Sequence, residues 1–167
     1  GKGAVVAYNL PSQFNTETTK SLSAQVVKNF GVEYKVIPID EIDRIYREDF
    51  EKHNHRIEKS LSKENLHARI RGNLMMLESN ESNALLISNG NKTEIALGYA
   101  TLYGDMCGGI SVIGDLSKMD VYAVSRYVNE KYGREVIPDE IFELRPSAEL
   151  GPNQYDPFDY PIVSPLV

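Results

Sequence analysis

The chain has 167 residues, of which 41% are hydrophobic, 25% charged and 9% aromatic. These ordinary globular values fit about one domain and exclude general disorder. The longest apolar runs, such as Ala84–Ile87, are far shorter than the ~18 residues that cross a bilayer. A net charge of −6 argues against nonspecific binding to nucleic acid or membranes. The single cysteine, Cys107, excludes an internal disulfide framework, and we expect a reducing, cytoplasmic compartment.

The first forty residues have the pattern of a parallel βαβ unit. The apolar run Ala4–Tyr8 predicts a buried strand, and Val32–Ile39 predicts a second strand. Between them, Lys20–Phe30 carries apolar residues at helical spacing and is followed by Gly31, a typical C-terminal cap. Because the joins are short, the two strands should pair in parallel.

The middle of the chain predicts helices and a short strand separated by turns. Glu41–Ser60 predicts a helix followed by a mobile loop, and Ala84–Ser88 predicts a short buried strand with a helix restarting near Thr93. Tyr103–Gly109 is glycine-rich and predicts a loop. Glu64–Leu77 predicts a helix whose core-facing stripe consists of Leu66, Ile70, Leu74 and Leu77.

The last third of the chain contains one clear helix start. Ser117 is placed as an N-cap with Asp120 three residues later, and the helix should stop before Gly133. Beyond Arg145 the chain is proline-rich, and we expect the tail 155–167 to be mostly loop. Together the elements predict an α/β protein with a doubly wound parallel sheet, in which ligands lie beyond the carboxyl ends of the strands.

Two polar segments could carry chemistry. Asn65, Arg69 and Asn73 share one face of the helix 64–77. That face is either a solvated surface or a binding face with Arg69 as the contact to an anion or an adenine. In the turn 88–94, backbone N–H groups could cradle phosphate, and Glu94 could hold a divalent cation or simply favour the positive end of a helix.

Three single residues also leave a functional and a structural interpretation open. Lys118 occupies the first helical position, where a cation opposes the helix dipole at a cost of about 0.3–1 kcal/mol. It is either a phosphate contact or a solvent-facing lysine. Asp105 lies among glycines and could contact a substrate or only close a tight connection. Ser147 could bind phosphate or cap a helix.

The cysteine and the histidines fit structural roles better than catalytic ones. Cys107 has no neighbouring base to activate it, and His67 lies on the helix 64–77. His53 and His55 flank a single residue, and their neighbourhood offers too few further ligands for zinc. We see no Ser/His/Asp arrangement of the kind used in nucleophilic catalysis.

Five segments resemble sequences that occur together, in this order and spacing, in one family. With the family's own sequence in parentheses, they are Leu10–Ser12 (LPS), Glu64–Asn73 (ENLQARIRGN), Asn89–Glu94 (GNKSE), Tyr99–Met106 (YATLYGDM, identical at every position) and Arg145–Leu150 (PPSAEL). The family they resemble is that of the NAD synthetases, and the match runs from Leu10 to about Gln154. The chain is most similar to the synthetase domain of the glutamine-dependent enzymes.

The resemblance implies an adenine nucleotide α-hydrolase-like fold of the ATP pyrophosphatase type. It also implies a ligase in which ATP adenylates the nicotinate carboxylate of deamido-NAD, pyrophosphate leaves, and ammonia then gives NAD and AMP. By motif, the resemblance implies that Glu94 binds Mg²⁺ and that ATP is bound by Arg69, Asn89, Lys118 and Ser147. It also implies that Asn65 and Asp105 bind deamido-NAD, and that Lys118 and Asp105 are catalytic.

One family motif is missing, the pyrophosphatase loop SGGxDS. We therefore expect residues 1–167 to be a partial synthetase domain, incomplete at its N-terminus and inactive by itself, with 155–167 as a proline-rich tail. The resemblance also implies a homodimer or higher homo-oligomer and, in the glutamine-dependent type, a glutaminase domain. Two alternatives are a non-catalytic truncated module that serves as a dimerisation surface, and another ATP pyrophosphatase amidoligase, against which the Tyr99–Met106 match argues.

Overall fold

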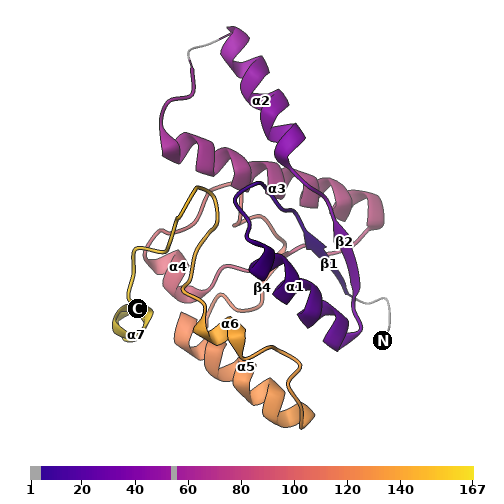
Figure 1. The fold of residues 1–167 in the computed structure, drawn as a ribbon, viewed down its shortest axis with the longest axis vertical. Helices are drawn as coiled ribbons and strands as arrows, with labels where there is room; N and C mark the ends of the chain where they lie inside the picture. The colour runs from indigo at the N-terminus through magenta and orange to yellow at the C-terminus, as the bar shows by residue number, and fades with distance from the viewer. Residues whose placement is uncertain (1–4, 54–55) are drawn as a thin grey trace. The chain divides into compact units, whose positions relative to one another are not determined.

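The computed structural model of the protein describes residues 5–53 and 56–167 (Figure 1). The chain divides into two compact units. The first consists of Gly1–Asp40 and Tyr122–Asp156, and the second of Glu41–Val121 and Pro157–Val167. No helix in the described ranges is long and apolar enough to cross a membrane.

The first unit contains the predicted βαβ arrangement. Strand β1 (Val6–Asn9) pairs in parallel with β2 (Glu33–Val36), and α1 (Glu17–Phe30) forms the crossover between them. Helix α1 ends at Gly31, whose φ of 66° is a left-handed conformation that glycine adopts without steric cost. The parallel pairing and the glycine cap are therefore confirmed.

The prediction that the first of these strands is buried is wrong, and the second strand is largely exposed as well. Val5 is 57% exposed and Val36 is 53% exposed. Among the described residues, β1 pairs only with β2, so neither strand has a second strand beside it. An apolar run indicates that a strand is suited to burial. Burial itself requires neighbours on both edges and both faces, which the described part of this unit does not supply.

Beyond the sheet, the first unit is held by an asparagine at the end of a helix. Helix α5 (Lys118–Tyr132) stops before Gly133, as predicted. Asn129 of α5 accepts hydrogen bonds from the N–H groups of Val136 (2.9 Å) and Ile137 (2.8 Å), which folds the chain back ahead of the short helix α6 (Glu140–Glu143). Val136 is completely buried and makes the centre of this unit.

The second unit is mainly helical, with one very short parallel strand pair. Its elements are α2 (Asp40–His53), α3 (Ser60–Ser82), β3 (Ile87–Ser88), α4 (Lys92–Ala96), β4 (Ile110–Ser111), α7 (Tyr160–Val163) and the 3-10 helix η1 (Ser164–Leu166). The strand predicted at 84–88 shrinks to two residues and is exposed. Its partner β4 was not predicted, because two residues are too few for an alternating pattern. His53 ends α2, whereas Asn54 and His55 lie outside the described residues.

Helix α3 buries only part of the predicted leucine stripe, because Ile70 is buried whereas Leu66 and Leu74 are half-buried. Its buried residues are His67, Ala68, Ile70 and Gly72, whereas Leu77 is 57% exposed. The reason is a close backbone approach. A Cβ on Gly72 would lie 2.8 Å from the carbonyl oxygen of Gly104, and a Cβ on Gly104 would lie 2.9 Å from the Cβ of Ala68. Only small residues fit where the predicted loop 103–109 lies on the helix.

The tail is more ordered than its prolines predicted. Residues 160–166 form α7 and η1, and Tyr160 and Ser164 are buried in the second unit. Each of these two short helices has a proline in its first turn, Pro161 in α7 and Pro165 in η1. The N–H groups of a first turn have no partner within the helix, so proline starts a helix there rather than preventing one.

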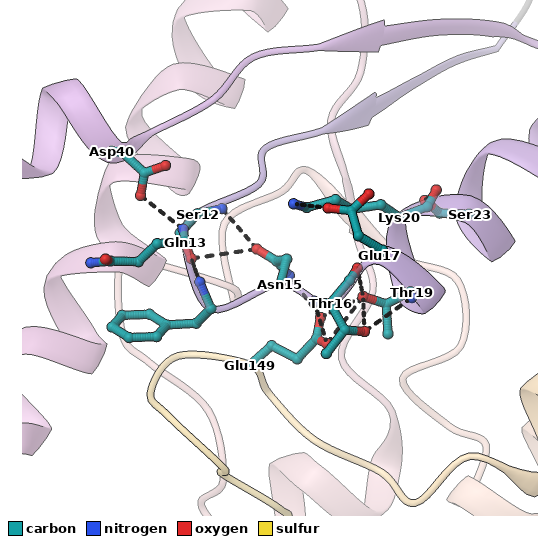
Figure 2. A network of polar contacts seen from close by, with 11 residues as sticks. Ser12, Gln13, Asn15, Thr16, Glu17, Thr19, Lys20, Ser23, Asp40 and Glu149 are labelled. Carbon is teal, nitrogen blue, oxygen red and sulfur yellow. Dashed lines mark hydrogen bonds and ion pairs between the residues drawn. The ribbon is translucent and has the colours of Figure 1, made fainter.

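The two loops of the first unit that resemble family motifs are tied together by one carboxylate. Figure 2 shows Glu149 beside the N-terminus of α1, where it accepts hydrogen bonds from the backbone N–H of Thr16 (3.3 Å), the amide of Asn15 (2.7 Å) and the hydroxyl of Thr19 (3.0 Å). Glu149 adopts a φ of 49°, which is uncommon for a residue with a Cβ. Its carboxylate thus acts as a tertiary cap of α1 and anchors the loop 145–150.

We predict that Glu149→Ala lowers the free energy of unfolding by about 1–2 kcal/mol, because three donors at the helix end lose their acceptor. Glu149→Gln should cost less, since one acceptor oxygen remains. The matched control is Glu17→Ala, at the same end of α1 but highly exposed, with an expected change within about 0.5 kcal/mol. Urea denaturation measures all three, and equal losses for the two alanine variants would contradict the assignment.

A buried histidine connects α2 to α3 in the second unit. Nε2 of His67 lies 3.1 Å from Oδ1 of Asp43, which in turn accepts a hydrogen bond from Nε of Arg47 at 3.0 Å. Burial lowers the pKa of His67. The carboxylate of Asp43 opposes this shift, and the charges of Arg71 and Arg47 add to it. His67 is structural, as predicted, and burial favours its neutral form.

This lowered pKa predicts a pH dependence of stability. The unfolded chain binds a proton at His67 near its ordinary pKa of about 6.5, whereas the folded protein binds it only at lower pH. The contribution of His67 to the free energy of unfolding is therefore fully present above about pH 6.5. It falls on acidification, with a limiting slope of about 1.4 kcal/mol per pH unit for one proton. We expect His67→Gln to flatten the urea midpoints between about pH 5 and 7. The control, exposed His53→Gln, should leave the slope unchanged.

Candidate functional site

The turn from β3 into α4 is closed by a reciprocal pair of hydrogen bonds. The N–H of Glu94 donates to Oδ1 of Asn91 (3.1 Å), and the N–H of Asn91 donates to Oε2 of Glu94 (3.1 Å). This is a capping box. Two of the N–H groups that could have cradled phosphate are thus bound to side chains, and one oxygen of Glu94 is engaged in its own turn.

A second capping arrangement starts α5. The N–H of Asp120 donates to the hydroxyl of Ser117 (3.2 Å), and the N–H of Ser117 donates to Oδ2 of Asp120 (3.1 Å). Hydrogen bonds from the hydroxyl and backbone of Ser117 lower the pKa of Asp120. The predicted N-cap is confirmed, and Lys118 is the first residue of the helix, as expected.

The two helix starts meet through Lys118. Its backbone N–H donates to Oγ1 of Thr93 (3.1 Å), and its Nζ lies 3.3 Å from Oε1 of Glu94. Both charged side chains are only about one-fifth exposed, at 20% for Lys118 and 21% for Glu94. The carboxylate offsets the unfavourable place of the lysine at a helix N-terminus. The structure therefore supplies a nearby anion of its own for Lys118.

Asp105 and Asn65 are connected through Thr101. Oδ1 of Asp105 accepts a hydrogen bond from the N–H of Thr101 (2.7 Å), and the hydroxyl of Thr101 donates to Oδ1 of Asn65 (2.8 Å). Although Asp105 is exposed as a residue, partial burial of its carboxyl raises its pKa, the N–H of Thr101 opposes this, and the charge of Glu94 adds to the rise. Asp105 is thus electrostatically coupled to the Lys118–Glu94 pair.

Arg69 lies at an open cleft of about 340 Å³ in the second unit. Its Nε donates to the carbonyl oxygen of Leu102 (3.1 Å), so the guanidinium is held against the loop that carries Asp105. A guanidinium has further N–H donors for an anion or a base. The cleft is lined by Tyr46, Leu66, Arg69, Ile70, Gly72, Asn73, Met76, Tyr103 and Cys107.

The remaining two predicted site residues are Asn89 and Ser147. Asn89 is exposed in the turn that follows β3. Ser147 belongs to the first unit, where its hydroxyl donates to the carbonyl oxygen of Gln154 and accepts from the N–H of Glu149 (3.0 Å). Its observed role is to shape the loop 147–154, and its phosphate contact remains a prediction.

Two residues near Lys118 were missed by the sequence reasoning. Thr93 is completely buried and holds the N–H of Lys118, and the ring of Tyr160 has its centroid 5.2 Å from Nζ of Lys118. Thr93 lies within a turn that was singled out only for its glycine, asparagines and charges. Tyr160 lies in the tail, where the prolines concealed any helical pattern.

The described residues contain no cluster of three or more His, Cys, Asp or Glu that could hold a metal ion. Near Lys118, the carboxylate of Glu94 is the predicted ligand, with Asp105 electrostatically coupled to it. Mg²⁺ is commonly bound through one or two carboxylates, with water and phosphate oxygens completing its shell. These residues fit an ion that arrives with a nucleotide, rather than one held by the protein alone.

Comparison with known proteins identifies the family. Residues 1–163 match the family model described as NAD synthase. The glutamine-dependent NAD(+) synthetase of Thermotoga maritima is 42% identical over 156 residues, which are 93% of this chain and 27% of that protein. The chain therefore spans about a quarter of the length of the curated relatives it matches.

Solved structures agree with this result. The glutamine-dependent NAD+ synthetase of Acinetobacter baumannii, in complex with ADP, aligns with a TM-score of 0.80 and 31% identity over 86% of this chain and 27% of that one. The NMN synthetase of Francisella tularensis shares the fold, with a TM-score of 0.85 and 22% identity over 96% of this chain and 65% of that one. The predicted α/β nucleotide-binding fold is confirmed. The chain belongs to the NAD synthase family.

Proposed function

We propose that the protein acts in the ATP-dependent amidation of deamido-NAD to NAD. The observation that carries this proposal is the Lys118–Glu94 pair, in which opposite charges at two helix starts are held 3.3 Å apart and largely shielded from water. Such a pair can bind a polyphosphate and its metal ion together, because Glu94 attracts the metal ion and Lys118 attracts the phosphate. The ADP complex of the Acinetobacter baumannii relative supports nucleotide binding.

The proposed reaction has two steps. A nicotinate carboxylate oxygen attacks the α-phosphorus of ATP, the bond from that phosphorus to pyrophosphate breaks, and an acyl-adenylate forms. Ammonia then attacks the acyl carbon, AMP leaves with the bonding electrons, and the nitrogen loses a proton. Negative charge grows on pyrophosphate in the first step, and a fixed ammonium such as that of Lys118 stabilises it most as the bond breaks.

The remaining site residues are proposed as binding groups. Arg69 and Asn89 would contact ATP, and Ser147 would contact its phosphates. Asn65 and Asp105 would face deamido-NAD. Asp105 is also proposed as a catalytic residue, whose carboxylate would take up the proton that the attacking nitrogen loses.

Magnesium, assembly and compartment belong to the same proposal. Glu94 would supply a carboxylate to Mg²⁺, which neutralises phosphate charge when bound. A homodimer or higher homo-oligomer and a cytoplasmic location complete it. The name of the Thermotoga maritima relative supports a glutaminase partner domain as the ammonia source. Membership of the NAD synthase family argues against the alternative of a different amidoligase.

We predict that Lys118→Ala in the full-length protein lowers kcat by roughly 10²–10³, as loss of one transition-state donor commonly does. The KM for deamido-NAD should change much less, because the lysine acts on the leaving pyrophosphate. Lys131→Ala is the matched control, since it removes the same charge from the exposed last turn of α5. Steady-state kinetics decide, and an unchanged kcat for Lys118→Ala would rule out this role.

Glu94→Gln should raise the Mg²⁺ concentration needed for half-maximal rate. The amide keeps an acceptor for the N–H of Asn91, so the capping box and the thermal midpoint should persist, whereas a hard anionic metal ligand is lost. A Mg²⁺ titration at fixed ATP measures the effect. Wild-type Mg²⁺ dependence in a variant with reduced Tm would show that Glu94 is only structural.

A further inference from the structure

We propose that Tyr160 is a positioning residue for Lys118, and that the segment 157–167 holds this lysine at both its backbone and its ammonium group. The inference rests on the proposed function of Lys118. It concerns a tail that lies outside the five resembling segments of the sequence, and its residues lie in the same unit as Lys118.

The first observation is the aromatic contact to the ammonium group. Nζ of Lys118 lies 5.2 Å from the ring centroid of Tyr160, within the distance of about 6 Å over which a ring face attracts a cation. Tyr160 is only 3% exposed, so this attraction is weakly screened by water. The ammonium group of Lys118 therefore lies near both the carboxylate of Glu94 and the face of a buried ring.

The second observation is that the ring itself is fixed. Phe158 packs edge-on against Tyr160, with centroids 6.2 Å apart, and against Tyr99, with centroids 5.2 Å apart. Edge-to-face pairs of this kind have a preferred geometry. Because its neighbours hold it, the ring of Tyr160 presents a constant face to the lysine.

The third observation is at the other end of the lysine. The hydroxyl of Ser164 in the tail lies 3.3 Å from that of Thr93, and Thr93 accepts the hydrogen bond from the N–H of Lys118. Both hydroxyl residues are buried. The tail thus reaches the backbone of Lys118 through Thr93, in addition to its ammonium group through Tyr160.

These contacts matter because a lysine side chain is long and flexible, and its many rotamers oppose a single position of the ammonium group. A charge that must act on a developing anion is most effective when it is already in place, since no reorganisation is then needed during the reaction. Loss of the ring face should therefore reduce kcat and leave the KM for deamido-NAD almost unchanged.

The test compares rings of nearly equal shape and opposite electrostatics in the full-length protein. Tyr160→Phe keeps the electron-rich face, and we expect kcat within about twofold of wild type. Replacing Tyr160 with pentafluorophenylalanine inverts the ring's quadrupole, and we expect kcat about tenfold below that of the Phe variant, with KM changed by less than about twofold. Equal kcat values for these two folded variants would overturn the proposal.

Two controls separate positioning from packing. The same fluorinated ring at Phe142, which packs against Tyr122 and Arg126, should leave kcat within about twofold of wild type. In a Lys118→Ala background, fluorination at position 160 should have no further effect on kcat, since coupled residues are non-additive. A tenfold loss that persists without the lysine would overturn the proposal.

The proposed function fails separately. If Lys118→Ala leaves kcat unchanged, the assignment of Lys118 falls, and the role of Tyr160 falls with it. If Lys118→Ala lowers kcat while the fluorinated ring at position 160 does not, only the inference about Tyr160 is wrong. Thermal midpoints of every variant, measured in parallel, confirm that folded proteins are being compared.

Discussion

The second unit depends on one steric constraint, the close approach of the loop 101–107 to the backbone of α3. At Gly72 and Gly104 a side chain would come within 3 Å of a neighbouring atom. This approach brings backbone carbonyls within reach of the helix, so Arg69 can donate to Leu102, and it places Thr101 against Asn65. A core of interlocking leucines would hold the loop several ångströms away and separate these polar contacts. The polar contacts of Arg69 and Asn65 on α3 therefore depend on the absence of side chains at Gly72 and Gly104.

The candidate site itself is formed by two helix starts that face each other. Each is closed locally, by the Asn91–Glu94 box at α4 and the Ser117–Asp120 box at α5. Local closure leaves Oε1 of Glu94 for Lys118, so one carboxylate both caps its own helix and holds the lysine of the next. Capping preferences therefore do more than start helices here, because the capping residue Glu94 also pairs with the opposite charge of Lys118.

Local chemistry explains which parts of this arrangement the sequence predicts. The cap at Ser117, the glycine end of α1 and the helix restart near Thr93 depend on a few neighbouring residues, and all three are confirmed. The errors concern contacts between distant segments. Leu77 was expected to be buried because it continues the apolar period of the helix. Periodicity cannot reveal that a distant loop packs closely against Gly72 and so determines which face is buried. Tyr160 was missed because prolines suggest disorder, although their position in a first turn favours a helix.

The charge balance around Lys118 gives the proposed magnesium requirement a physical basis. The ammonium of Lys118 is already paired with Glu94, and Asp105 adds a second nearby acidic group whose pKa the charge of Glu94 raises. A polyphosphate without a metal ion would therefore be attracted only weakly to this site, because the local charges nearly cancel and the chain carries a net charge of −6. A divalent cation would reduce this conflict, because Glu94 would supply a carboxylate to it and would then offset less of the charge of Lys118. The ring of Tyr160 is uncharged, and its face would continue to attract the ammonium group of Lys118.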